Sequence, residues 1–217
     1  MPAPNELQTE RLLLRAMDPE GDAEDILDWY HLESTAQYTT HAPLTTLAEV
    51  RSFLTQRFTN DATALNYAVT LPLSTSGTGK SHRVIGVIGC RHWPELGYTF
   101  HPAFHGKGYA TEAVRAFVAE LFHVMPAAKR PAMHYMSVDS AKMTGETGEE
   151  GFDYALGFCD SENVASQRVL ERVGFSKGDV IPEEYESKLL GMRDSVPMFL
   201  ARPGTEVPRE WLQKKVE

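Results

Sequence analysis

The sequence predicts a mixed α/β layer fold with helices on both sides of a central sheet. Segments with helical periodicity alternate with strand-like segments, and several strand-like segments follow one another as they do in antiparallel sheets. A length of 217 residues, with 42% hydrophobic and 24% charged residues, fits one medium-sized domain with a substantial core.

The first part of the chain is predicted to contain one strand and two helices. Residues 11–16 (RLLLRA) have the character of a short opening strand. Asp18-Pro19-Glu20 predicts the start of a helix that ends near Ser34, because an early proline and acids in the first turn favour a helix start. A second helix is predicted to begin after Thr46, which has capping-box spacing to Glu49.

Three strands are predicted in the middle of the chain. They cover residues 67–71, 83–90 and 96–100, where β-branched and aromatic residues are frequent. The Ser, Thr and Gly tract at residues 74–80 has the composition of a flexible connection. The third strand ends at His101-Pro102 and leads almost directly into a glycine-rich turn.

This glycine turn, residues 105–110 (HGKGYA), runs without a break into a predicted helix over residues 110–122. Glycine lets a ligand approach the main chain closely. A helix N-terminus presents unpaired N–H donors and about half a positive charge, so a phosphate is its natural partner. The segment predicts an anion site, and the alternative is a glycine-rich loop that caps an ordinary helix.

The last third of the chain is predicted to hold one helix and several strand regions. The helix covers residues 163–173 and ends at Gly174, a frequent C-cap residue. Strand character is found at residues 133–138, at residues 152–159, from Phe175 onward and at residues 196–201.

Charge and hydropathy exclude several classes of partner. A net charge of −9 argues against nucleic-acid binding, which requires clustered Lys and Arg. The acidic stretch within residues 146–162 could attract an amine substrate, and the alternative is a solvated acidic loop. No apolar run approaches the roughly 18 residues needed to cross a bilayer, and the N-terminus lacks secretory-signal features. We therefore expect a soluble, cytoplasmic protein without membrane partners.

Cys90 and Cys159 lie in sequence contexts that suggest neither a metal cluster nor an activated nucleophile. A disulfide is possible but not implied, and buried or spare thiols are the simpler interpretation. No metal site is expected.

Three segments match a known pattern in order and approximate spacing. They are residues 9–15 (TERLLLR), residues 97–113 (GYTFHPAFHGKGYATEA) and residues 163–175 (NVASQRVLERVGF). Together they resemble the GNAT superfamily of acyl-CoA-dependent N-acetyltransferases, in the branch that includes ribosomal-protein N-terminal acetyltransferases. The resemblance implies a mostly antiparallel, twisted sheet of six to seven strands flanked by about four helices. It also implies one domain over residues 7–202 with an insertion at 127–151, followed by a C-terminal tail at 203–217.

The resemblance implies acetyl-CoA as the acyl donor. Backbone donors of the glycine turn would hold the pyrophosphate, and the strand over residues 96–100 would pair with the pantetheine arm. Asn163 would lie beside that arm, and its alternative role is to cap the last helix. The family usually has Gln or Arg where this chain has His105, so a side-chain contact is altered. The implied cofactor-binding residues are Phe100, His105, Gly106, Lys107, Gly108, Tyr109, Ala110, Thr111, Asn163 and Ser166.

The catalytic residues are also implied by the resemblance. Many members carry a Tyr in the last helix that protonates the leaving thiolate, and here the matching residue is Leu170. Ser166 is then the candidate donor, and helix packing is its alternative role. An amine must lose a proton before it attacks, and the candidate bases beside the third strand are Glu95 and then His101. Tyr98 is interpreted as a packed strand aromatic.

The predicted function is direct transfer of an acetyl group to a primary amine, of a protein N-terminus or of a small molecule, in a ternary complex. The acceptor groove is expected between residues 22–60 and 127–151. One alternative is a non-catalytic acyl-CoA-binding or regulatory module. Another is an unrelated phosphate-binding protein, although no Walker or G-x-G-x-x-G motif is present at the turn. Monomer and homodimer are both compatible with the sequence.

Overall fold

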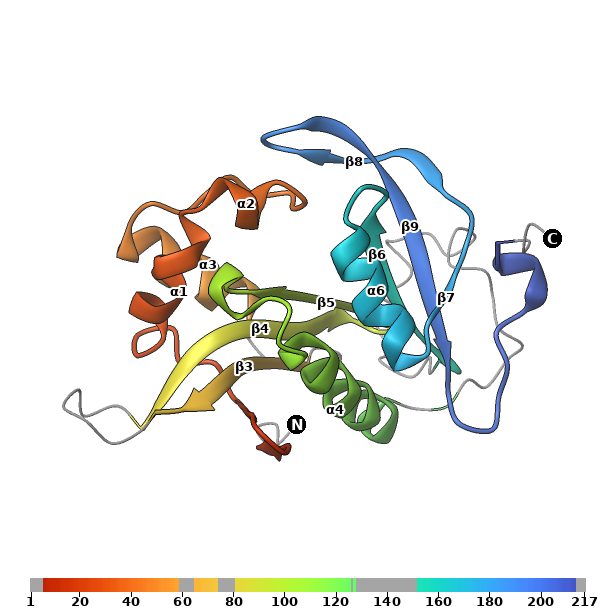
Figure 1. The fold of residues 1–217 in the computed structure, drawn as a ribbon, viewed down its shortest axis with the longest axis horizontal. Helices are drawn as coiled ribbons and strands as arrows, with labels where there is room; N and C mark the ends of the chain where they lie inside the picture. Colours follow the sequence, from red (N-terminus) through yellow and green to blue (C-terminus); the bar gives the residue numbers. More distant parts are fainter. Residues whose placement is uncertain (1–5, 59–64, 74–80, 126, 128–151, 214–217) are drawn as a thin grey trace.

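The computed structural model describes residues 6–58, 65–73, 81–125, 127 and 152–213. In these residues one sheet of nine strands runs in the order β1-β2-β3-β4-β5-β6-β9-β7, and β8 pairs with β9 (Figure 1). The strands are β1 (Leu7–Gln8), β2 (Leu13–Arg15), β3 (Leu65–Pro72), β4 (His82–His92), β5 (Glu95–Phe100), β6 (Tyr154–Asp160), β7 (Ser176–Lys177), β8 (Ile181–Ser187) and β9 (Gly191–Ala201). The helices are α1 (Ala23–Tyr30), α2 (Glu33–Ala36), α3 (Leu47–Arg57), α4 (Tyr109–Val124) and α6 (Val164–Val173), with the short 3₁₀ turns η1 (Pro102–Phe104) and η3 (Arg209–Trp211).

The predicted mixed α/β fold with a mostly antiparallel sheet is confirmed, since every strand pair is antiparallel except β5 with β6. The nine described strands exceed the predicted six to seven. The difference arises because β1 and β7 are only two residues long, too short to show a pattern, and because β8 joins the sheet as a hairpin partner of β9.

Helices cover both faces of the sheet, as predicted. On one face α1 and α3 pack on Ala68, Val84 and Val87. On the other face α4 and α6 pack on alternate residues of the same strands, including Tyr67 and Ile88. The alternation follows from the pleat, which directs successive side chains to opposite faces. The two faces are therefore separate hydrophobic layers on one sheet.

The first helix starts later and ends earlier than predicted. Residues 18–22 form a turn instead, in which the Asp22 carboxylate accepts a hydrogen bond from the amide of Asp18 at 2.9 Å and pairs with Arg15 at 2.6 Å. The chain becomes helical only at Ala23, and it breaks after Tyr30 before the short α2. The proline signal thus marked the turn that precedes the helix.

Three other predicted helix ends are confirmed, whereas the helix predicted over residues 110–122 runs from Tyr109 to Val124. Thr46 and Glu49 form a capping box at the start of α3. Asn163 caps α6, with its side chain accepting from the amide of Ser166, and Gly174 ends α6 in the left-handed region at a φ of 115°. These short-range signals are readable from sequence because only neighbouring residues determine them.

The described residues after β9, up to residue 213, pack in part against the sheet. The last predicted strand begins at Gly191 and not at Val196. Beyond it, Trp211 is buried against Tyr154 and Phe199 and extends the core of the sheet. The predicted strand at 133–138, and the predicted insertion at 127–151 apart from residue 127, lie outside the described residues. In the part of the chain that is described, no helix is long and apolar enough to span a membrane.

Candidate active site

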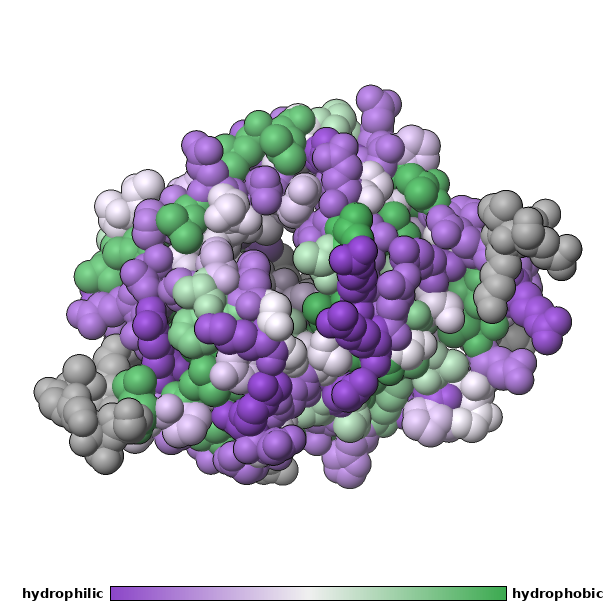
Figure 2. All heavy atoms as spheres, viewed as in Figure 1, coloured by the Kyte–Doolittle hydropathy of each residue, from purple (hydrophilic) through white to green (hydrophobic). Residues whose placement is uncertain are grey.

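The sheet opens between β5 and β6. These parallel strands pair only through Glu95 with Leu156 and Leu96 with Gly157, and then they part (Figure 1). A cavity of about 580 Å³ occupies the opening. Its walls include residues 97–99 of β5 and residues 158–160 of β6. In Figure 2 the surface is hollowed between the side that carries α1–α3 and the side that carries α6 and β9.

The glycine turn lies at the far end of β5. The strand passes through η1 into the turn, where Gly106 has a φ of 74° and Gly108 a φ of 84°. Gly108 is the N-cap of the 16-residue helix α4. Both glycines are in the left-handed region of backbone conformation, which residues other than glycine adopt only at a cost in free energy. A Cβ on Gly108 would also lie 3.3 Å from a guanidinium nitrogen of Arg11.

Most backbone amides of the glycine turn have no acceptor among the described residues. The amide of His105 donates to Pro102, and the amide of Glu112 donates to Gly108. For the amides of residues 106–111 between them, the described residues offer no hydrogen-bond acceptor. Unpaired amides at the positive end of a helix are the geometry that an anion requires.

The basic side chains of the turn are engaged with the protein backbone. His105 Nε2 lies 2.9 Å from the carbonyl oxygen of Phe100, and Lys107 Nζ donates to the carbonyl of Ala103 at 2.9 Å. His105, which stands where the family usually has Gln or Arg, therefore links the glycine turn to the end of β5. What remains for a ligand is mainly the backbone of the turn.

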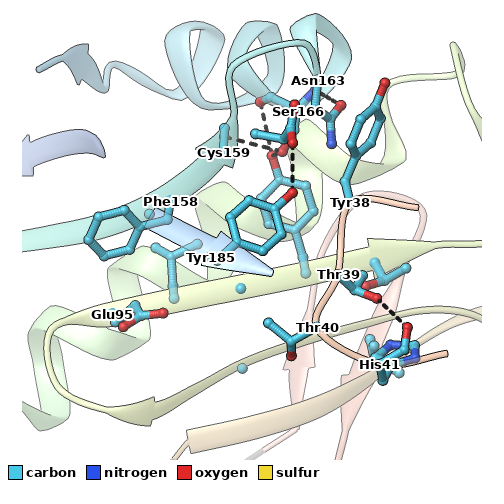
Figure 3. A pocket seen from close by; sticks show the side chains of 18 of the residues that line it. Tyr38, Thr39, Thr40, His41, Glu95, Phe158, Cys159, Asn163, Ser166 and Tyr185 are labelled. Carbon is cyan, nitrogen blue, oxygen red and sulfur yellow. Dashed lines mark hydrogen bonds between the residues drawn. The ribbon is translucent and has the colours of Figure 1, made fainter. Parts of the chain in front are cut away.

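Ser166 lies at the centre of a group of polar side chains in the cavity (Figure 3). Its Oγ lies 2.8 Å from the hydroxyl of Tyr98 and 3.5 Å from Cys159 Sγ, which donates to it. Its amide donates to Asn163 Oδ1 at 3.1 Å. Leu170 lines the same cavity one turn along α6. The segments that carry Ser166 and Tyr98 are thus brought together although they are far apart in sequence.

Tyr98 and Cys159 were not assigned a site role from sequence. The sequence predicts a packing role for Tyr98 and a buried or spare thiol for Cys159, which is buried. The structure places both in the cavity. Burial raises the pKa of the Tyr98 hydroxyl above its ordinary value and raises the pKa of the Cys159 thiol to about 11. Both groups therefore stay protonated at neutral pH. Alternation along β5 could have indicated that Tyr98 faces the same side as Leu96.

The opposite wall of the cavity is aromatic. His41 stacks on Tyr30 with 5.4 Å between ring centroids and meets the edge of Phe53 at 4.9 Å. Burial lowers the pKa of the His41 ring, so the ring is neutral at pH 7. The aromatic residues that line the cavity on this side are Tyr30, Tyr38, His41, Phe53 and Phe58, and Phe158 adds a ring from β6.

Two carboxylates that the cavity contains are candidates for a base. Glu95 lines it at the start of β5, as the sequence suggested. Glu184, which sequence reasoning missed because the β8–β9 hairpin has little pattern, also lines it and accepts a hydrogen bond from Ser195 at 2.9 Å. Ser195 pairs with Asp160, next to Cys159, whereas Glu95 pairs with Leu156, four residues earlier on β6. Glu184 is therefore near the level of Cys159, which contacts Ser166, and Glu95 is about 13 Å along the strands from the pair of Ser195 and Asp160.

His101 does not belong to this group. It is absent from the cavity wall, and both its ring nitrogens have partners. Nδ1 accepts from the amide of Ala103 at 3.1 Å, and Nε2 lies 3.1 Å from Asp28. The side chain caps η1 and holds α1 to the sheet, so the structure does not support His101 as a base.

The predicted cofactor residues form two groups joined by β5. Asn163 and Ser166 lie in the cavity, and residues 105–111 form the turn at the start of α4. Phe100 connects the groups: its side chain is buried, and its carbonyl contacts His105. Among the described residues, no three His, Cys, Asp or Glu side chains are grouped so that they could hold a metal ion.

Solved structures share this fold. An acetyltransferase of the GNAT family from Bacillus anthracis has a TM-score of 0.64 and 19% identity, covering 91% of this chain and 98% of its own. RimL, a ribosomal L7/L12 alpha-N-protein acetyltransferase in complex with coenzyme A, has a TM-score of 0.63 and 15% identity, covering 91% and 98%. The microcin C7 self-immunity acetyltransferase MccE, in complex with acetyl-CoA and AMP, has a TM-score of 0.63 and 15% identity, covering 89% and 93%.

These identities are low, and they show a common fold. No curated protein sequence matches the chain. The family model described as an acetyltransferase (GNAT) domain matches residues 11–176, which contain the sheet opening, the glycine turn and Ser166. The chain therefore belongs to the GNAT family of N-acetyltransferases.

Proposed function

We propose that this protein transfers the acetyl group of acetyl-CoA to a primary amine by direct attack in a ternary complex. The observation that carries the proposal is the continuity of β5, which runs from the cavity to the glycine turn without an intervening domain or long loop. An extended ligand with an anionic group at one end and a reactive group at the other matches this arrangement.

The residues present fit such a donor. The amides of residues 106–111 would hold the pyrophosphate, helped by the dipole of α4. The edge of β5 that parts from β6 after Leu96 would pair with the amides of the pantetheine arm. Only glycine suits position 108, because of its φ and the nearness of Arg11. When bound, acetyl-CoA supplies an acetyl group activated as a thioester.

The aromatic wall and the two carboxylates would receive the amine. A carboxylate attracts the ammonium form and accepts its proton, which leaves the neutral amine able to attack. An α-amino group titrates near 7.7–8.0 and a lysine amine near 10.4, so the α-amine is easier to deprotonate at neutral pH. Glu184 is near the level of Cys159, which contacts Ser166, and we take it as the first candidate base and Glu95 as the second.

The fold neighbours act in different settings. One is a ribosomal L7/L12 alpha-N-protein acetyltransferase, and another is a self-immunity acetyltransferase solved in complex with acetyl-CoA and AMP. The acceptor of this chain is therefore proposed as a primary amine, carried either by a protein N-terminus or by a small molecule.

Calorimetry with acetyl-CoA tests whether the protein binds the proposed acyl donor. Release of free thiol in the presence of a panel of amines tests whether it transfers the acetyl group. The panel contains peptides with free N-termini, N-acetylated lysine peptides, and small aryl and alkyl amines. We expect binding and amine-dependent thiol release. Binding with no thiol release for any amine would support the non-catalytic module, and no binding would contradict the proposed function.

A further inference from the structure

Two polar side chains converge on the hydroxyl oxygen of Ser166. Cys159 Sγ donates to Oγ at 3.5 Å, and the hydroxyl of Tyr98 lies 2.8 Å from the same atom. The Tyr98 hydroxyl also lies 3.0 Å from the backbone carbonyl oxygen of Ser166, so its single proton can be donated either to that carbonyl or to Oγ. The three side chains come from β5, β6 and α6, the elements that border the sheet opening.

A serine hydroxyl has one proton to donate and two lone pairs to accept with. If Cys159 and Tyr98 both donate to Oγ, the two lone pairs are filled. The serine proton then points away from both donors, toward the cavity that all three side chains line. If Tyr98 donates to the carbonyl instead, the serine proton can turn back to the phenol oxygen. The direction of the Tyr98 proton thus decides whether Ser166 offers a donor to the cavity.

Both convergent groups keep their protons under ordinary conditions. Burial raises the pKa of the Tyr98 hydroxyl, and burial raises the pKa of the Cys159 thiol to about 11. Cys159 is 3% exposed. Neither group is therefore suited to act as a nucleophile, and each remains a hydrogen-bond donor.

We propose that Tyr98 and Cys159 are positioning residues that turn the hydroxyl of Ser166 into a donor aimed at the sulfur of coenzyme A. The inference rests on the proposed function. It gives this chain a substitute for the tyrosine hydroxyl that Leu170 lacks: the phenol comes from β5 and acts through the serine of α6.

The step balances without a further reactant. The carboxylate base first passes the ammonium proton that it has accepted to solvent. As the C–N bond then forms, the neutral amine gives its second proton to the carboxylate, and the electron pair of the C–S bond moves to sulfur. Ser166 donates a hydrogen bond to that sulfur and keeps its own proton. Solvent protonates the thiolate on release. A serine need not act as a full acid in this scheme, which agrees with its weak acidity.

The experiment compares the dissociation constants of coenzyme A and of desulfo-coenzyme A, which lacks the sulfur. The wild type is expected to bind coenzyme A about tenfold more tightly, the strength of one hydrogen bond to a charged or polarisable group. Ser166→Ala should abolish this preference. Tyr98→Phe and Cys159→Ala should each reduce it, whereas Cys159→Ser, which keeps a donor, should retain more of it than Cys159→Ala.

Turnover provides a second readout. Tyr98→Phe should lower kcat about tenfold with an unchanged KM for acetyl-CoA, and it should have no further effect in a Ser166→Ala background, because it acts through that serine. Tyr67→Phe is the matched control: Tyr67 is buried in the same sheet, and its hydroxyl has no hydrogen-bond partner among the described residues. It should change neither the preference for sulfur nor kcat.

The outcomes separate the two proposals. Equal preference for the sulfur in wild type, Tyr98→Phe and Cys159→Ala would overturn the positioning role while leaving the proposed function intact. Additive losses of kcat in Tyr98→Phe and Ser166→Ala would overturn it as well. Failure of both coenzyme A and its desulfo form to bind the wild type would contradict the proposed function, and the inference with it.

Discussion

The guanidinium of Arg11 lies against the first turn of α4, where its Nε donates to Glu112 Oε2 at 2.7 Å. The same carboxylate accepts from the hydroxyl of Thr9 at 2.6 Å and from the amide of Arg11 at 2.9 Å. Arg11 also donates to the carbonyl of Lys107 inside the glycine turn. Residues 9–11 are thus fastened to the glycine turn that is proposed to bind the pyrophosphate.

Glu112→Gln should destabilise the fold by about 1–2 kcal/mol at neutral pH, because an amide cannot accept all the hydrogen bonds that the carboxylate receives. Partial burial raises the pKa of Glu112, but the hydrogen bonds from Thr9 and Arg11 outweigh it and hold the pKa below its ordinary value. Urea unfolding of both proteins measures the difference.

The pH dependence of that difference follows from the lowered pKa. A carboxyl whose pKa falls on folding stabilises the folded state fully above its unfolded pKa, and this stabilisation is lost as the pH falls through the folded value. The difference between wild type and Glu112→Gln should therefore be constant near neutrality and shrink below about pH 4.5. A difference that grows on acidification would contradict this account.

Gly108→Val should abolish acetyl-CoA binding, because a branched side chain at the N-cap obstructs the amides and meets Arg11. The left-handed φ of 84° also makes the variant less stable, by about 1–3 kcal/mol. Gly204→Val is the control, since Gly204 has a φ of 88° with open space around it and lies in the C-terminal stretch. Calorimetry should show normal acetyl-CoA binding for Gly204→Val. Normal acetyl-CoA binding by Gly108→Val would contradict the proposed role of the glycine turn.

Sequence was sufficient where neighbouring residues decide the structure. The capping box of Thr46, the caps of α6 and the glycine turn all depend on spacings of a few residues, and all are present. The start of α1 was misjudged because the pairing of Asp22 with Arg15 competes with the helix signal at Pro19. That competition depends on the contact between β2, which carries Arg15, and the turn at residues 18–22, which carries Asp22.

The candidate site was harder to predict because it is assembled from distant segments. Tyr98 meets Ser166 only when β5, β6 and α6 pack together, and 68 residues separate the two in sequence. Glu184 enters through a hairpin that bends over the cavity from β9. The sequence also offers His101 as a candidate base, but in the folded protein its ring pairs with Asp28. Side-chain chemistry alone does not distinguish these cases.

Substitution of the base should reduce turnover about 100-fold or more, the range typical of general-base removal. We expect this loss for Glu184→Gln and a loss of less than about threefold for Glu95→Gln, because Glu184 is near the level of Cys159, which contacts Ser166, and Glu95 is not. The measurement is kcat/KM for the amine across pH, with acetyl-CoA saturating. If the fall of kcat/KM at low pH disappears in Glu95→Gln and not in Glu184→Gln, then Glu95 is the base and Glu184 is not.

Asp160→Asn should destabilise the protein by about 3 kcal/mol, because its side chain is fully buried and is paired with Arg193 at 2.9 Å. The carboxylate also accepts from Tyr185 at 2.7 Å, and together these contacts hold the end of β6 against the β8–β9 hairpin. Glu162→Gln is the matched control. Glu162 pairs with the same arginine at 2.8 Å, but its side chain is 68% exposed, so its loss should cost less than about 1 kcal/mol. Thermal and urea unfolding of the two variants compare the contributions, and equal destabilisation would show that burial does not set the strength of this pair.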